Sequence, residues 1–229
     1  MKRFWTDVSV DSDRSIRLDA RPVRTPGRAP LALPTAALAA AVADEWRAVG
    51  ETLDPRAMPL TGLANAAIDR IAPAPEAFGA GLAAYAESDL LCYRADAPAE
   101  LVARQAAAWD PLLDWARDRY DVHFEIVTGV MHRAQPPATV ARLGEAVASR
   151  GAFQLAPLSP LVTLTGTLIG ALALAERAVS ADALWQAAMV DEDWQAERWG
   201  EDPLAAQARA GKRHDYDAAA RLLALLSDD

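Results

Sequence analysis

Hydrophobic and polar residues follow two different periods along the chain. Residues 4–10 (FWTDVSV) alternate, residues 11–13 form a polar turn, and alternation resumes at residues 16–18 (IRL), as expected of short strands. Prolines then divide the next segment into short extended pieces, at positions 22, 26, 30 and 34. From Thr35, a favourable N-cap, the apolar residues recur with helical spacing. The pattern predicts a small sheet followed by helices.

Helices dominate the remainder of the predicted structure. The expected segments are 36–49, 59–71, 74–93, 97–119, 137–150, 158–178, 181–199 and 204–226. The alternating segment 123–128 (HFEIVT) predicts a short strand, which either extends the N-terminal sheet or pairs locally. We place a boundary in the proline-containing stretch 94–98. The predicted class is α+β, mostly α: an N-terminal mixed β/α domain (1–95) and a C-terminal multihelical domain (96–229).

Residues 151–175 carry no charged side chain, which raises the question of a membrane helix. Pro157 and Pro160 are expected to break this stretch, and what remains is shorter than the ~20 residues that a span needs. We therefore predict a buried core helix and no membrane insertion. Gly166 and Gly170 have the spacing of a close helix crossing.

The predicted helix 181–199 carries an unusual acidic residue. On a helical wheel, Glu192 falls in the middle of an apolar stripe made of Leu184, Trp185, Ala188, Met189, Gln195, Ala196 and Trp199. Trp194 falls nearly opposite this stripe and is expected to be exposed. A carboxylate among apolar side chains must be paired, protonated or solvated. Glu192 is therefore either half of an ion pair with an internal arginine or the charged centre of an aromatic contact site.

Composition narrows the classes of partner. The 229 residues include 52% hydrophobic residues and have a net charge of −9, which disfavours nucleic acid and anionic membranes and favours a basic or neutral protein partner. The single cysteine, Cys92, excludes an internal disulfide framework and indicates a reducing compartment. No apolar signal segment follows the basic start of the sequence.

The sequence offers no strong catalytic signature. Its three histidines lack metal-site spacing, and it contains no phosphate-binding glycine loop and no nucleophile elbow. Cys92 lies among leucines, as a buried hydrophobe does, and Asp89 is expected to pair with Arg94. We predict no metal and no cofactor. Trp46 follows two acids and is a candidate contact residue, although core packing is the stronger interpretation.

Several motifs, in this order and spacing, resemble one family. They are RFW at 3–5, LDARPVRTP at 18–26, LPT at 33–35, EW at 45–46, MPLT at 58–61, DLLCYR at 89–94, DEDWQ at 191–195 and WG at 199–200. The chain is similar in these motifs to the assembly chaperones of F1-type ATP synthase that attend the alpha subunit. The resemblance spans nearly the whole chain. Two positions depart from the family pattern: Ala20 replaces a frequent glycine and Trp194 a frequent phenylalanine.

The resemblance implies a chaperone that uses no ATP and is not an enzyme. It would bind the unassembled alpha subunit and shield its subunit-contact surface until the beta subunit replaces it. The family's acidic position falls on Glu192, with Asp191 as the alternative. The candidate contact residues are Glu192, Asp191, Gln195, Trp199, Trp194 and Trp46. We expect a monomer in the bacterial cytoplasm, with the mitochondrial matrix for eukaryotic relatives.

Two alternatives remain at this point. In the first, Glu192 is the acid or base of a small-molecule enzyme, which requires a deep pocket and a second titratable group. In the second, the protein associates with itself and Glu192 pairs across a dimer.

Overall fold

The computed structural model describes residues 2–129, 131–200 and 202–227. The chain divides into two compact units. Unit 1 consists of Met1–Pro75, Gly151–Pro157 and Asp217–Asp229, and unit 2 of Glu76–Arg150 and Leu158–Tyr216. The boundary predicted between residues 95 and 96 therefore lies inside unit 2. Two later segments return to unit 1, which a boundary drawn along the sequence does not anticipate.

Unit 1 contains the predicted N-terminal sheet. Strands β1 (Val8–Val10), β2 (Ile16–Leu18) and β3 (Arg21–Pro22) pair antiparallel in the order β1-β2-β3. Helix α1 (Ala36–Ala48) follows, and the hydroxyl of its N-cap Thr35 accepts a hydrogen bond from the Leu38 amide at 3.2 Å. The predicted strands and the helix start are confirmed.

The core of unit 1 lies between this sheet and two helices. Helix α2 (Pro59–Ala66) continues into a π-helical turn (Ala67–Ile71). The Trp5 and Trp46 rings meet edge to face, with centroids 5.4 Å apart. Glu45 caps α2: its carboxylate accepts the amides of Leu60 and Thr61, both at 2.8 Å. Both residues of the EW motif therefore have structural roles within unit 1: Trp46 packs against Trp5, and Glu45 caps α2.

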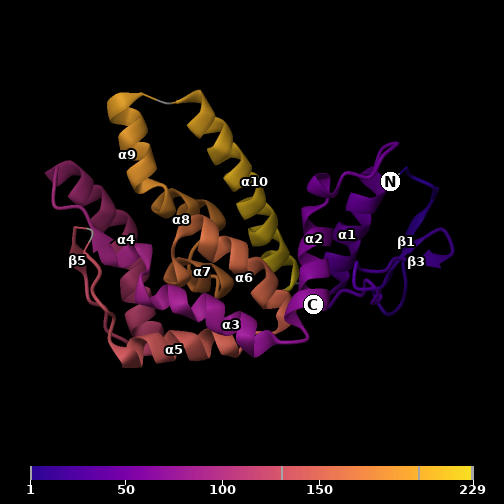
Figure 1. Cartoon of the computed structure of the whole chain (residues 1–229), viewed down its shortest axis with the longest axis horizontal. Coiled ribbons are helices and arrows are strands. Elements are labelled where there is room, and N and C mark those ends of the chain that lie inside the picture. Colours follow the sequence, from indigo (N-terminus) through magenta and orange to yellow (C-terminus); the bar gives the residue numbers. More distant parts are fainter. Residues whose placement is uncertain (1, 130, 201, 228–229) are drawn as a thin grey trace. The chain divides into compact units, whose positions relative to one another are not determined.

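Unit 2 is almost entirely helical (Figure 1). Its helices are α3 (Pro75–Ala83), α4 (Ala99–Tyr120), α5 (Pro137–Ala148), α6 (Ala152–Thr165), α7 (Leu168–Ala175), α8 (Ala181–Ala188), α9 (Val190–Trp199) and α10 (Pro203–Leu225). Pro75, residues 152–157 of α6 and residues 217–225 of α10 belong to unit 1. Two short 3-10 turns, Ala84–Glu87 and Leu90–Cys92, follow α3. The mostly helical α+β class is confirmed.

The segment predicted as one helix over 74–93 is shorter than expected. After α3 and the two 3-10 turns, the chain enters strand β4 (Tyr93–Arg94), which pairs in parallel with β5 (Val127–Thr128). The segment 123–128 therefore contributes a local strand and does not join the N-terminal sheet. The Asp89 side chain accepts the Leu91 amide at 3.0 Å and starts a separate turn there, which explains why the helix does not continue.

The uncharged stretch also differs from its prediction. Helix α6 includes Pro157 and Pro160 instead of being broken by them. Each proline removes one backbone hydrogen bond, but the helix buries Leu158 and Leu161 completely, and this packing outweighs the loss. The break falls at Gly166, whose φ of 72° is easily adopted only by glycine. At Gly170 a Cβ atom would collide with Leu184, so this glycine permits the close approach of α7 and α8.

Asp89 is a fully buried carboxylate in unit 2. It does not pair with Arg94, which binds Asp110 at 2.6 Å instead. Its second oxygen accepts the Ile169 amide at 2.9 Å, at the start of α7, where the helix dipole favours negative charge. Burial raises the pKa of Asp89 to about 6, although the hydrogen bonds from Ile169 and Leu91 act in the opposite direction.

This raised pKa predicts how the stability depends on pH. In the unfolded chain the carboxyl has an ordinary pKa of 3.8, so the folded protein binds the proton more tightly. Its contribution to stability is greatest at low pH and is lost as pH rises from about 4 to 6. We expect the free energy of unfolding of the wild type, relative to Asp89→Asn, to fall by ~2 kcal/mol between pH 4 and pH 7. Urea unfolding at several pH values measures this difference.

The exposed Asp118 on α4 provides the control. The difference between the wild type and Asp118→Asn should change little over the same pH range. A pH-independent difference between the wild type and Asp89→Asn would show that Asp89 does not titrate as described.

Candidate functional site

Helix α9 does not continue α8. The predicted helix 181–199 is interrupted at Met189, whose backbone (φ −96°, ψ 6°) ends α8 and starts α9. The interruption changes which side chains share a face, so the predicted stripe does not exist as one surface. Trp194, expected to be exposed, is buried with 5% of its surface accessible. Glu192, expected among apolar side chains, is exposed.

Trp194 attaches α9 to α4. The guanidinium of Arg104 lies 4.9 Å from its ring centroid, and that of Arg198 lies 4.4 Å away. Both cations are also paired: Arg104 with Glu197 at 2.8 Å, and Arg198 with Glu100. A tryptophan between two arginines combines cation–π attraction with burial, which fixes this helix on α4.

Asp191 lies at the same contact, beside a buried glutamine of α4. The Gln105 Nε2 donates to Asp191 Oδ1 at 2.7 Å, while its Oε1 accepts the Ala95 amide at 2.8 Å. Gln105 is 2% exposed, so both ends of its amide are satisfied in the interior. This arrangement fixes the orientation of the Asp191 carboxylate.

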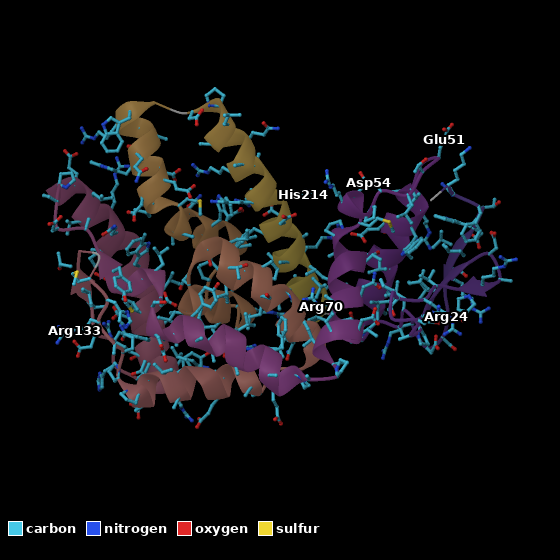
Figure 2. All side chains as sticks on the ribbon, viewed as in Figure 1. Arg24, Glu51, Asp54, Arg70, Arg133 and His214 are labelled. Atoms are coloured by element: carbon cyan, nitrogen blue, oxygen red, sulfur yellow. The ribbon has the colours of Figure 1, made fainter. Side chains whose placement is uncertain are left out.

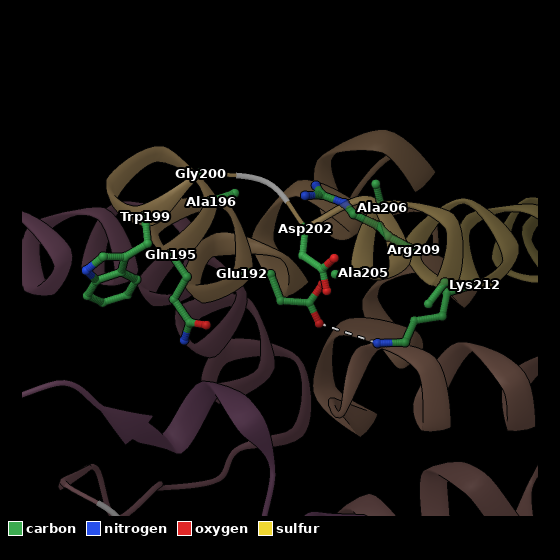
Figure 3. A pocket seen from close by; sticks show the side chains of 11 residues that line it. Glu192, Gln195, Ala196, Trp199, Gly200, Asp202, Ala205, Ala206, Arg209 and Lys212 are labelled. Atoms are coloured by element: carbon green, nitrogen blue, oxygen red, sulfur yellow. Dashed lines mark hydrogen bonds and ion pairs between the residues drawn. The ribbon is translucent and has the colours of Figure 1, made fainter.

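A pocket of about 410 Å³ separates α9 from the first turns of α10. Glu192 Oε1 and Lys212 Nζ approach each other across it at 3.4 Å (Figure 3). Nearby, Asp193 pairs with Arg209 at 2.5 Å. The pocket is lined by Glu192, Gln195, Ala196, Trp199, Gly200, Asp202, Ala205, Ala206, Ala208, Arg209 and Lys212. The internal partner of Glu192 is thus a lysine, where the sequence suggested an arginine.

Trp199 stands at the end of α9 and is 78% exposed. Gly200 ends the helix there with a φ of 87°, a backbone conformation that residues with a Cβ atom rarely adopt. Leu204, at the start of α10, is 75% exposed. An indole that is exposed to this degree is a common feature of protein-binding sites.

Five of the six predicted contact residues lie on one helix, but Glu192 faces α10 whereas Asp191 and Trp194 face α4. Glu192, Asp191, Gln195, Trp194 and Trp199 all lie on α9. Trp46 is separate: it is 8% exposed in the core of unit 1.

Sequence reasoning missed the residues that complete this site from other helices. These are Gln105 and Arg104 of α4, Asp202 directly before α10, and Arg209 and Lys212 of α10. Ala205, Ala208, Arg209 and Lys212 have the three- and four-residue spacing of one helix face, which is the signal that was available.

The histidines and the cysteine are the other side chains considered for metal binding or catalysis. Among the residues whose structure is described, no cluster of histidine, cysteine or acidic side chains is placed to hold a metal ion. His214 lies on α10, far along the chain from His123 and His132 (Figure 2). Burial raises the pKa of the Cys92 thiol to about 12, so it is a poor nucleophile at neutral pH. Within the same described ranges, no helix is both long enough and apolar enough to cross a bilayer.

An exposed aromatic residue beside a largely apolar pocket with charged side chains is a common feature of binding proteins. Residues 2–117 match the family model of the ATP12 chaperone protein. The chain belongs to the ATP12 chaperone family, the ATP synthase assembly chaperones indicated by the sequence motifs.

Solved structures support the same assignment. Atp12 from Paracoccus denitrificans is 43% identical, with 98% of each chain covered and a TM-score of 0.89. An aspartate-to-lysine mutant of that protein gives 43% identity, coverage of 98% and 97%, and a TM-score of 0.90. A proposed chaperone from Agrobacterium tumefaciens is 42% identical, covers 99% of this chain and 86% of its own, and has a TM-score of 0.93.

Proposed function

We propose that this protein binds the unassembled alpha subunit of ATP synthase and covers its subunit-contact surface until the beta subunit replaces the chaperone. It uses no nucleotide and catalyses no reaction. The observation that carries the proposal is the exposed Trp199, which borders the pocket of Glu192 in a member of the ATP12 chaperone family. Glu192, Asp191, Gln195 and Trp199 contact the client, and Trp194 holds their helix in place.

A chaperone that must release its client needs a displaceable interface. A few aromatic anchors provide most of the binding energy at many interfaces, and the surrounding charges determine how the two partners align. Trp199 is such an anchor because most of its indole is available for burial. The Glu192–Lys212 pair is half-exposed at 3.4 Å, and pairs of this kind contribute little to stability. A client side chain can therefore displace it at small cost.

Separate expression of the alpha and beta subunits tests the proposal directly. We expect this protein, carrying an affinity tag, to co-purify with alpha and not with beta when each is produced alone. Added beta should then displace the chaperone from alpha in the absence of nucleotide. Capture of beta alone, or of neither subunit, would contradict the proposal. Sedimentation of the free protein tests the predicted monomer against the dimer in which Glu192 pairs with a second copy.

The substitution Glu192→Lys is expected to weaken alpha-subunit binding by about tenfold, because two like charges then occupy the pocket and the client loses its carboxylate partner. Unfolding free energy should stay within ~0.5 kcal/mol of the wild type, since the site is exposed. Titration of the alpha subunit, followed by fluorescence anisotropy, measures the loss.

The charge-swapped variant Glu192→Lys/Lys212→Glu separates two roles. It restores the internal pair with reversed polarity. If Glu192 contacts the client, binding stays weak in the double variant. Full recovery of binding would show that the pair matters only for the shape of the pocket.

A further inference from the structure

A second groove lies on the other side of α9, and what it binds deepens the proposed function, on which this inference rests. Its volume is about 420 Å³. Segments from α4, the chain before it, Gly129 and α9 form its walls. Trp199 and Gln195 border both this groove and the α9–α10 pocket. Helix α9, which lies between α4 and α10 in Figure 1, therefore separates two hollows, and Trp199 is its last residue.

The two hollows differ in how their charges are balanced. The α9–α10 pocket contains two cations: Lys212 faces Glu192, and Arg209 is paired with the neighbouring Asp193, while the carboxylate of Asp202 accepts the Leu204 amide. The α4-side groove is lined by two acidic residues, Asp96 and Asp191. Within the part of the chain that the structure describes, neither of these two has an ion-pair partner.

The arginine that lines this groove is already paired with another carboxylate. Arg94 lines the groove, but its guanidinium pairs with Asp110 at 2.6 Å and lies 5.2 Å from the centroid of the Trp109 ring. Its Nε also donates to the Leu91 carbonyl at 3.0 Å. With Arg94 neutralised in this way, the groove has an excess of negative charge.

Gln105 fixes the orientation of one of the two carboxylates. It donates to a single oxygen of Asp191, at 2.7 Å. A carboxylate has about four acceptor positions on two oxygens, so most of the acceptor capacity of Asp191 is available to a ligand. The orientation is set in the free protein, which reduces the entropy lost on binding.

The rest of the groove is suited to an apolar stem and a flat cation. Its walls include Tyr93, Pro98, Leu101 and Trp199. Arginine carries a planar, delocalised charge that bonds to carboxylates through two parallel hydrogen bonds and stacks on aromatic rings. We propose that the α4-side groove receives an arginine side chain from the client segment that covers Trp199, with Asp96 and Asp191 as its carboxylate partners.

The first test removes the two charges and keeps the side-chain shapes. We expect Asp96→Asn/Asp191→Asn to bind the isolated alpha subunit about tenfold more weakly than the wild type, with a smaller salt dependence. The asparagine at 191 can still accept from Gln105, so the thermal transition should not move. Asp118→Asn, on the exposed face of α4, removes a charge away from the groove and should bind within twofold of the wild type.

The second test identifies the chemistry of the ligand. Overlapping peptides that cover the alpha subunit are scanned for binding, and each arginine in a bound peptide is replaced by citrulline, which keeps the shape and loses the charge. We expect the wild type to discriminate against citrulline about tenfold and the double variant to bind both peptides equally. Equal binding of the two peptides by the wild type would overturn the proposal, as would a lysine replacement that binds as well as arginine.

The outcomes separate this inference from the proposed function. If the wild type and Asp96→Asn/Asp191→Asn capture the alpha subunit equally well, the groove does not bind an arginine and the proposed function stands. If the wild type does not capture the alpha subunit at all, the proposed function fails.

Discussion

Replacement of Trp199 by alanine should weaken binding of the alpha subunit by at least about tenfold and leave the folded protein as stable as the wild type. The indole is 78% exposed, so the fold gains little from it, whereas a client that covers it would bury most of its surface. Tryptophan is among the residues whose truncation most often costs 2 kcal/mol or more at an interface, roughly thirtyfold in affinity. Equilibrium binding and suppression of alpha-subunit aggregation both measure the effect.

Met131 offers a matched control in the same unit. It is 79% exposed, and Met131→Ala therefore removes a similarly accessible apolar side chain. It should bind the alpha subunit within twofold of the wild type. If Trp199→Ala retains full affinity and full suppression of aggregation, the end of α9 is not the client-binding site.

Replacement of Trp109 by alanine should destabilise unit 2 by about 4 kcal/mol, in the range found for large aromatic residues deleted from cores. Trp109 is completely buried in α4. Its Nε1 donates to the Ala187 carbonyl of α8 at 2.7 Å, and Arg94 lies over its ring. The alanine variant leaves a cavity, an unpaired carbonyl and an arginine without its aromatic support.

Two further variants make this second result interpretable. Trp109→Phe keeps an aromatic ring and loses the hydrogen bond, so we expect a smaller loss of about 1–2 kcal/mol. Trp199→Ala deletes the same side chain at an exposed position and should change the free energy of unfolding by less than about 0.5 kcal/mol. Urea unfolding measures all three. A Trp109→Ala protein with the wild-type midpoint would show that α4 and α8 do not depend on this contact.

Local patterns in the sequence were enough to determine many elements of this protein. The alternation of apolar and polar residues before position 19 predicted β1 and β2. The Thr35 N-cap and the helical spacing of the apolar residues after it predicted α1. All three elements are present. These signals act over a few residues, because a cap or a strand face depends on near neighbours in the chain. The order of the motifs likewise identified the family, which the comparisons confirm.

Tertiary contacts decided the surface of the candidate site. A helical wheel assumes one continuous helix, and the turn at Met189 changes the phase, which buries Trp194 against α4 and turns Glu192 toward α10. The same contacts supply Gln105 and Lys212 from elements distant in sequence. Burial of its apolar side chains also keeps α6 continuous across two prolines. Packing free energy depends on neighbours brought together only by folding. The sequence therefore predicted that residues 181–199 are helical, and the tertiary structure determined the interruption at Met189 and the direction in which each side chain faces.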